Sequence, residues 1–92
     1  PKVWFEAGRV IAQMHQFDVW HADLNVFNLL VDAQDKVWII DLDRGRRKAL
    51  TAMQRAENLS RLLRSVKKVA PELESTCWHL FKQGYQAVFN DA

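Results

Sequence analysis

Cysteine, proline and glycine are scarce in this chain of 92 residues, which contains one, two and three of them respectively. The single cysteine, Cys77, has no second cysteine for an internal disulfide, so the chain suits a reducing, cytoplasmic setting. No apolar run approaches the roughly 18 to 20 residues of a membrane span, and no signal peptide is visible. The apolar content of 49% and aromatic content of 11% predict one compact unit with a packed core rather than a disordered tail.

Charges of opposite sign are concentrated in different parts of the chain. Residues 1–43 carry three basic and seven acidic side chains, whereas residues 44–68 carry nine basic side chains and one acidic side chain, Glu57. Residues 69–92 have a net charge of −2. A local positive potential beside an acidic segment predicts a partner that carries phosphates or carboxylates.

Apolar side chains at helical spacing predict three helices. The first covers residues 3–16, where Gly8 either weakens the helix or lets a neighbouring helix approach. The second covers residues 51–68, and its predicted buried stripe comprises Ala52, Ala56, Leu59, Leu62, Leu63 and Val66. The exposed side of this helix is predicted to carry Arg61, Arg64 and Lys68. The third helix is predicted to begin at Pro71 and to end near residue 90.

Shorter patterns predict extended structure between the first two helices. Residues 29–31 and 37–40 are rich in apolar, β-branched and aromatic side chains, and the polar residues 32–35 between them predict a hairpin with a four-residue turn. Asp32 and Asp35 are predicted to be turn residues. Trp38 and Trp78 are assigned to the core. Residues 17–20 predict a brief extended segment that leads into His21.

The hairpin is framed by two motifs that are typical of phosphoryl transfer. The string before it is His21-Ala22-Asp23-Leu24-Asn25-Val26-Phe27-Asn28, which fits the kinase catalytic-loop pattern H-x-D-L-x-x-x-N. Asp41 follows the second strand, in the position of the magnesium-binding aspartate of kinases. Such a transfer needs a base for the acceptor hydroxyl and oxygen ligands for metal ions. Asp23 is therefore the predicted catalytic base, and Asn28 and Asp41 are the predicted metal ligands.

The hairpin brings the two motifs together, because its strands return the chain to the place that it left. An isolated H-x-D-L string is more often a turn with a capping aspartate, but the ordered combination of Asp23, Asn28, the hairpin and Asp41 favours a catalytic site. His21 is predicted to support the loop through hydrogen bonds to backbone near Asp41. His15, near the end of the first helix, is predicted to be a structural or surface residue rather than a catalytic one.

The residues that follow Asp41 leave alternatives open. Asp43 either assists the metal site, caps the following segment or pairs with Arg44. Residues 44–48 are predicted to form a basic loop, and their cations either contact an anionic substrate or form a solvated face. These cations are Arg44, Arg46, Arg47 and Lys48.

Three strings together resemble the bacterial lipopolysaccharide-core kinases, the Kdo kinases among them. They are His21 to Asn28, then Ile40-Asp41-Leu42-Asp43-Arg44-Gly45, and Asn58-Leu59-Ser60-Arg61-Leu62-Leu63-Arg64-Ser65. The resemblance covers nearly the whole chain. It implies an α+β fold in which residues 1–92 form part of the C-terminal lobe of a protein-kinase-like domain, mostly helical with a short hairpin beside the catalytic loop. No glycine-rich loop precedes His21, so the nucleotide-binding lobe is expected to lie N-terminal to these residues.

The same resemblance implies an activity and a location. Members of this family transfer phosphate from ATP, with Mg²⁺ or Mn²⁺, to the 4-hydroxyl of a 3-deoxy-D-manno-octulosonic acid (Kdo) sugar attached to lipid A. This step of lipopolysaccharide biosynthesis takes place at the cytoplasmic face of the inner membrane of Gram-negative bacteria, where the enzyme is a peripheral protein. Asp23 is then the base, and Asn28 and Asp41 bind the metal of the nucleotide. Clustered cations suit both a phosphorylated glycolipid and an anionic membrane surface.

The sequence departs from protein kinases in two respects, and other functions stay open. Asp43 occupies the position of the glycine in D-F-G, and no A-P-E segment is present, which argues against a protein substrate. A RIO-like or antibiotic-type small-molecule kinase is an alternative enzyme, and a kinase-like binding module without turnover is an alternative of another class. A nucleic-acid partner is not expected, because the basic residues are not interleaved with exposed aromatic ones.

Overall fold

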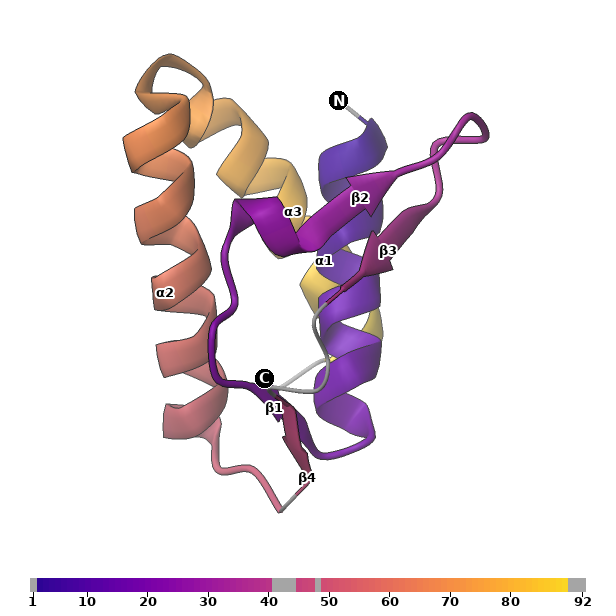
Figure 1. Cartoon of the computed structure of the whole chain (residues 1–92), viewed down its shortest axis with the longest axis vertical. Coiled ribbons are helices and arrows are strands. Elements are labelled where there is room, and N and C mark those ends of the chain that lie inside the picture. The colour runs from indigo at the N-terminus through magenta and orange to yellow at the C-terminus, as the bar shows by residue number, and fades with distance from the viewer. Residues whose placement is uncertain (1, 41–44, 48, 90–92) are drawn as a thin grey trace.

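The computed structural model describes residues 2–40, 45–47 and 49–89, and for residues 45–47, 73 and 74 it describes only the backbone (Figure 1). The helices are α1 (Lys2–Gln16), α2 (Ala52–Val69) and α3 (Glu74–Val88), with short 3-10 turns η1 (Val26–Asn28) and η3 (Pro71–Leu73). The strands are β1 (Val19–His21), β2 (Leu29–Val31), β3 (Val37–Ile39) and β4 (Gly45–Arg47). The predicted class, mostly helical α+β, is confirmed.

Helices α1 and α3 pack most closely of all the described elements, and glycine permits the contact. A Cβ atom at Gly8 would collide with the backbone carbonyl of Phe81, and one at Gly84 would collide with the backbone carbonyl of Phe5. Each helix therefore presents a glycine to the backbone of the other. Of the two predictions for Gly8, the approach of a neighbouring helix is the one that the structure confirms.

The core lies between the three helices and the loop that precedes η1. Its fully buried apolar side chains include Ile11, Ala12, Leu24, Leu62 and Phe81. Trp78 is half-buried and stacks on Phe81 with ring centroids 4.5 Å apart, as its assignment to the core predicted.

The buried face of α2 differs from the predicted stripe. Leu62 and Val66 are buried as predicted, but Ala52 and Ala56 are exposed, and the third fully buried residue is polar Asn58. The alanine methyl groups contribute little apolar area, so the larger side chains set the rotation of the helix. The prediction was wrong for the first turns of α2.

The strands form two separate antiparallel pairs within the described residues, β1 with β4 and β2 with β3. In the first pair, Val19 lies opposite Arg47 and His21 opposite Gly45. The prediction of a basic loop was therefore wrong for residues 45–47. Pairing of β4 is a backbone interaction with β1, and a run of basic side chains carries no signal of it.

The predicted hairpin is present, but its turn and its tryptophan differ from the prediction. Leu29 pairs with Ile39 and Val31 with Val37, so the connection has five residues, 32–36, rather than four. Asp32 organises this turn: Oδ1 accepts from the backbone N–H groups of Gln34 and Lys36 at 2.8 and 3.0 Å. Asp35 has a φ of 61°, so both aspartates are turn residues as predicted.

Trp38 is 55% exposed and not part of the core. Its indole N–H donates to Asp32 Oδ2 at 3.0 Å, which satisfies its polar atom at the surface. This hydrogen bond is the main cause of a lowered pKa of the Asp32 carboxyl, followed by the bond from Lys36. The alternation of the strand places Trp38 on the outer side of the hairpin, opposite Leu30.

The third helix begins later than predicted. Pro71 opens the 3-10 turn η3, and α3 begins at Glu74. The predicted end near residue 90 agrees with an end at Val88. Within the part of the chain described by the structure, no helix has both the length and the apolar character needed to cross a membrane.

We expect Gly84→Ala to lower the free energy of unfolding by about 1–3 kcal/mol. The added methyl meets a backbone carbonyl of α1, which outweighs the gain of about 1 kcal/mol in helix propensity. Denaturation of the full-length protein with urea, followed by circular dichroism, measures the change. Gln86→Ala, at an exposed position of the same helix, should change stability by less than about 0.5 kcal/mol. A Gly84→Ala protein as stable as the parent would contradict this packing.

Candidate active site

The predicted catalytic loop, residues 21–28, begins at the end of β1, runs alongside α2 and ends with η1 (Figure 1). His21 and Leu24 are each 0% exposed, and Asn28 is also buried. Asp23 lies between the first two of these residues and is exposed. The loop is thus anchored in the core on both sides of the predicted base, and the carboxylate is held at the surface.

The His21 ring connects the loop to the end of β3. Its Nδ1 accepts from the backbone N–H of Asp23 at 3.1 Å. A backbone N–H can only donate, so the ring proton lies on Nε2, which donates to the Ile40 carbonyl at 3.0 Å. The hydrogen bond to backbone near Asp41 is therefore present as predicted. Because both ring nitrogens are occupied, His21 positions Asp23 rather than acting as an acid or a base.

Asn58 of α2 holds the His21 backbone and was missed in the sequence. Its Nδ2 group donates to the His21 carbonyl at 2.8 Å, and its Oδ1 accepts from the His21 N–H at 3.3 Å. The side chain is 1% exposed. Its spacing in the sequence could have indicated its burial. Asn58 precedes Leu62 and Val66 at intervals of four residues, so a polar side chain occupies a core position.

His15 extends this contact to α3. Because Asn58 Oδ1 is an acceptor, His15 Nε2 donates to it, at 3.0 Å, and Nδ1 accepts from the Tyr85 hydroxyl at 2.8 Å. The ring is 1% exposed. Burial is the main cause of a lowered pKa of His15, and the nearby Arg55 cation lowers it further, while the hydrogen bond to Asn58 raises it. The prediction of a structural rather than catalytic role fits this buried, neutral ring.

Ser65, two turns after Asn58 on α2, holds the loop at a second point. Its hydroxyl oxygen accepts from the Val26 N–H at 2.9 Å, and the hydroxyl donates to the Leu62 carbonyl at 2.7 Å. Sequence analysis did not assign Ser65 a role. One face of α2 therefore fixes the loop at both ends.

The two asparagines around η1 form a reciprocal cap. Asn25 Oδ1 accepts from the Phe27 N–H at 2.8 Å, and Asn28 Oδ1 accepts from the Asn25 N–H at 3.2 Å. The Asn28 carbonyl also accepts from the Ile40 N–H at 2.8 Å. The predicted ligand Asn28 therefore lies next to the residue that precedes Asp41 in sequence.

The remaining predicted site residues fall largely outside the described part of the chain. Asp41, Asp43, Arg44 and Lys48 lie outside the described residues, and Arg46 and Arg47 are described only as backbone of β4. Among the described residues no group of three histidine, cysteine, aspartate or glutamate side chains could hold a metal ion. The donor set of Asn28 and Asp41, an amide oxygen and a carboxylate, nevertheless fits the chemistry of Mg²⁺, which takes few protein ligands and keeps several waters.

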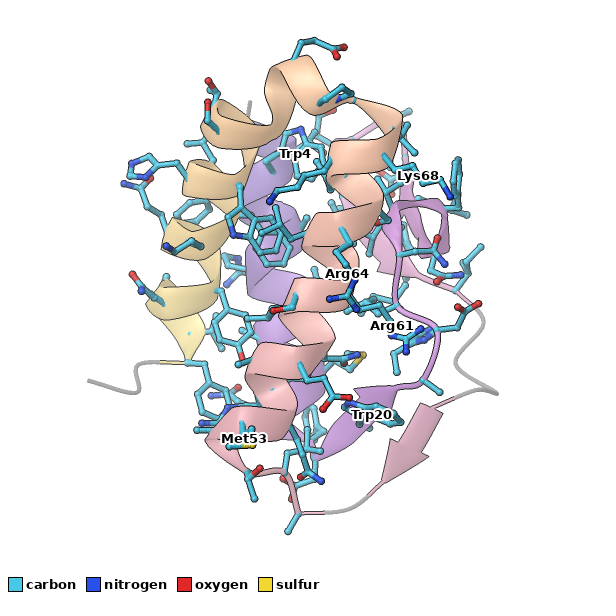
Figure 2. The ribbon with its side chains drawn as sticks, turned by 90° about the vertical axis from the view of Figure 1, so that its left-hand side faces the viewer. Trp4, Trp20, Met53, Arg61, Arg64 and Lys68 are labelled. Atoms are coloured by element: carbon cyan, nitrogen blue, oxygen red, sulfur yellow. The ribbon has the colours of Figure 1, made fainter. Side chains whose placement is uncertain are left out.

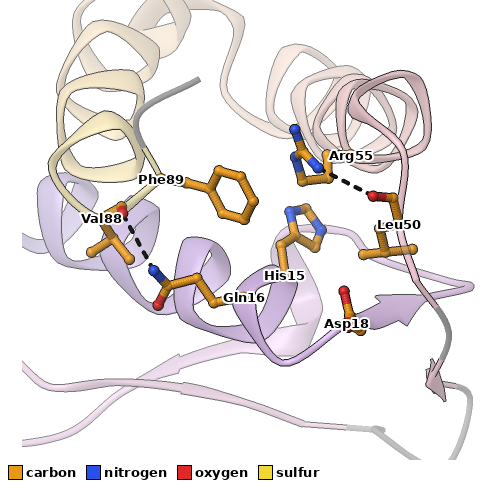
Figure 3. Close-up of a pocket in the computed structure, with 7 residues that line it drawn as sticks. All are labelled: His15, Gln16, Asp18, Leu50, Arg55, Val88 and Phe89. Atoms are coloured by element: carbon orange, nitrogen blue, oxygen red, sulfur yellow. Dashed lines mark hydrogen bonds between the residues drawn. The ribbon is translucent and has the colours of Figure 1, made fainter. Parts of the chain in front are cut away.

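A pocket of about 370 Å³ lies on the other side of His15, at the ends of α1 and α3 (Figure 3). Its described lining comprises His15, Gln16, Asp18, Leu50, Arg55, Val88 and Phe89. Arg55 donates to the Leu50 carbonyl at 3.3 Å and lies over the Phe89 ring, 4.2 Å from its centroid. None of the described lining residues belongs to the predicted catalytic loop.

Comparison with known proteins agrees with the motif of the loop. Residues 1–85 match the model of the lipopolysaccharide kinase (Kdo/WaaP) family. The chain belongs to this family. Proteins named 3-deoxy-D-manno-octulosonic acid kinase are similar to this chain over most of its length.

Three relatives of this family illustrate the similarity. The kinase of Photobacterium profundum is 40% identical over 88 residues, which cover 91% of this chain and 37% of the relative. The kinase of Xylella fastidiosa (strain M12) is 42% identical over 69 residues, 75% of this chain and 28% of the relative. The kinase of Vibrio parahaemolyticus is 51% identical over 61 residues, 66% of this chain and 25% of the relative. The chain thus spans well under half the length of the relatives that it matches.

We expect Asn58→Ala to lower the free energy of unfolding by about 2–4 kcal/mol, because the His21 N–H and C=O groups lose a buried partner. Urea denaturation of the full-length protein measures this loss. Glu57→Ala, at the adjacent exposed position, is the matched control and should stay within about 0.5 kcal/mol of the parent. Equal denaturation midpoints for Asn58→Ala and the parent would show that the hydrogen bonds between Asn58 and the His21 backbone do not contribute to stability.

The lowered pKa of His15 predicts a pH dependence of stability. In the unfolded chain His15 gains a proton below about pH 6.5, whereas the folded protein gains it only at lower pH. The unfolded state then binds more protons, so stability falls as pH decreases from about 6.5 to the folded pKa, with a slope of up to about 1.4 kcal/mol per pH unit. Denaturation midpoints between pH 5 and 8 measure this slope.

Two matched variants test whether His15 is the histidine that causes this pH dependence. His15→Gln should give a shallower slope below pH 6.5, and His79→Gln, at an exposed position of α3, should keep the slope of the parent. The same slope in His15→Gln and in the parent would refute the assignment to His15.

Proposed function

We propose that the protein transfers the γ-phosphoryl group of ATP to the 4-hydroxyl of a Kdo sugar on lipid A, as a kinase of lipopolysaccharide core biosynthesis. Membership of the Kdo/WaaP family supports this proposal, as does the name of the relatives. The observation that carries it is the exposed Asp23, held between buried His21 and Leu24 in a loop of kinase pattern.

Asp23 is the proposed base of the reaction. Its carboxylate accepts the proton of the sugar hydroxyl while the hydroxyl oxygen forms a bond to the γ-phosphorus of ATP. The bond between that phosphorus and the bridging oxygen breaks, and ADP leaves with the electron pair. The products are ADP and a phosphate monoester of the sugar. The hydrogen bond from the Asp23 N–H to His21 orients the backbone that carries the base.

Asn28 and Asp41 are the residues that would hold the divalent ion, Mg²⁺ or Mn²⁺, with Asp43 as an additional candidate. When bound, the ion neutralises negative charge on the nucleotide phosphates. The backbone bond to Ile40 fixes the position of Asn28, and its Oδ1, which accepts from the Asn25 N–H, has a second lone pair with which it would bind the ion.

We further propose that residues 1–92 are the part of a kinase-like C-terminal lobe that contains the catalytic loop, and that the nucleotide-binding lobe precedes it. The matched relatives are longer than this chain, which is consistent with a second lobe. Because the proposed acceptor is a membrane glycolipid, we place the enzyme at the cytoplasmic face of the inner membrane as a peripheral protein.

We expect Asp23→Asn to lower the rate of ³²P transfer from ATP to Kdo-lipid A by about 10²–10⁴-fold, which is the range for loss of a general base. The full-length protein is assayed, and circular dichroism verifies that the variant is folded. Asp35→Asn changes an exposed acid in the hairpin turn, where φ is positive and asparagine is tolerated, and it should retain full activity.

Several outcomes would contradict the proposal. Full activity of Asp23→Asn would exclude Asp23 as the base. Transfer to aminoglycosides or other small molecules, but not to Kdo-lipid A, would indicate a small-molecule kinase. Metal-dependent ATP binding with no transfer to any acceptor would indicate a binding module.

A further inference from the structure

The outer face of α2 carries a cluster of cations. We define this face by four exposed residues in the second half of the helix, Arg61, Arg64, Lys67 and Lys68. The acid of α2, Glu57, is exposed one turn before Arg61 on the same side of the helix, so this side carries four cations and one acid. Figure 2 views the molecule from this side, with Arg61, Arg64 and Lys68 distributed along α2.

The opposite face of α2 fixes the direction in which these cations point. Leu62 is 0% exposed and Val66 is 1% exposed, and both belong to the buried core. Rotation of the helix would expose these apolar side chains, so the packing keeps the basic face turned to solvent. The result is an array of positive charge carried by a packed helix rather than by a flexible basic tail.

This array adjoins the candidate catalytic loop. Asn58, Arg61 and Ser65 are spaced at i, i+3 and i+7, which places them along one side of the helix. Asn58 and Ser65 are the residues that bind the loop, at His21 and Val26. Arg61 therefore lies at the border between the loop and the outer face, and a surface bound to this face would lie beside the loop that carries Asp23.

An exposed apolar side chain shares the basic side of the helix. Met53 is 79% exposed and precedes Arg64 by eleven residues, three helical turns, so the two side chains point in the same direction. Because the apolar face of α2 is buried in the core, the cations of the outer face, rather than an apolar helix face, would supply most of the attraction to a bilayer.

We propose that the outer face of α2 docks on an anionic lipid bilayer and so presents Asp23 to an acceptor in the membrane. This inference rests on the proposed function, whose acceptor is a membrane glycolipid. Clustered Arg and Lys side chains are attracted by the negative surface potential of the inner leaflet. A single-stranded nucleic acid is the less suitable partner, because α2 contains no aromatic residue on which bases could stack.

Vesicle binding by the full-length protein tests the proposal. Co-sedimentation is measured with vesicles of phosphatidylcholine alone and with 30% phosphatidylglycerol added. The double variant Arg64→Gln/Lys68→Gln is compared with Lys36→Gln/Lys82→Gln, which removes the same charge from exposed positions on the hairpin turn and on α3. All four positions are exposed, and thermal unfolding verifies that both variants keep the stability of the parent.

We expect the parent to prefer the anionic vesicles, with binding that weakens as salt is added. Loss of about fivefold affinity per cation predicts that Arg64→Gln/Lys68→Gln binds about 30-fold more weakly, whereas the control variant binds as the parent does. Equal binding by the two variants, or no preference for anionic vesicles, would overturn the proposal. Binding of RNA through the same two residues, with no binding of vesicles, would also overturn it.

The assay of phosphate transfer to a detergent-solubilised acceptor separates this proposal from the proposed function. Arg64→Gln/Lys68→Gln should keep the parent's rate with this acceptor and lose rate only when the acceptor is in anionic vesicles. If the parent transfers no phosphate but still binds anionic vesicles through Arg64 and Lys68, the docking surface is correct and the proposed function is wrong.

Discussion

The side-chain amide of Asn58 joins the helical core to the loop that carries Asp23. It contacts both backbone polar groups of His21 and the ring of His15. The two histidines and Asn58 are almost completely buried, so water cannot replace a lost partner, and each broken bond would have a high cost. The geometry of the candidate active site therefore depends on how α2 packs against the rest of the molecule.

The other two helices are held together by close contact between their backbones. Gly8 and Gly84 let α1 and α3 approach until a methyl group would not fit between them. This approach brings Tyr85 of α3 to His15 of α1, and His15 in turn donates to Asn58 of α2. The proposed base, Asp23, is exposed but held by buried residues on both sides, so it would need little reorganisation during the reaction, which is the general requirement for a preorganised site.

Much of the fold was predictable because it is encoded in local patterns. Helical periodicity gave α1 and α2 to within a residue or two, and two short runs of apolar, β-branched and aromatic residues around a polar turn gave the hairpin. What the sequence did not reveal depends on partners that are distant in the chain. Strand β4 forms through backbone bonds to β1. Asn58 is buried against His21 and His15, which lie 37 and 43 residues before it in the sequence.

For the candidate site, the motif predicted the residues of the loop and the role of His21 in supporting it. The structure adds the residues that hold the loop in place, Asn58 and Ser65, which a motif of the loop itself cannot contain. Trp38 was assigned to the core because its side chain is aromatic, and this assignment was wrong. The pleat of β3 and the hydrogen bond to Asp32 keep it at the surface. The roles of Asp23, Asn28 and Asp41 in catalysis stay predictions.

Hydrogen exchange of backbone amides tests most directly whether α2 fixes the loop. The N–H groups of His21 and Val26 donate to Asn58 and Ser65, so we predict that they exchange as slowly as the core amide of Ile11 in α1. The amides of Gln34 and Lys36, bonded only to Asp32 in the exposed turn, should exchange rapidly. Exchange of His21 and Val26 at the rate of these turn amides would contradict the account.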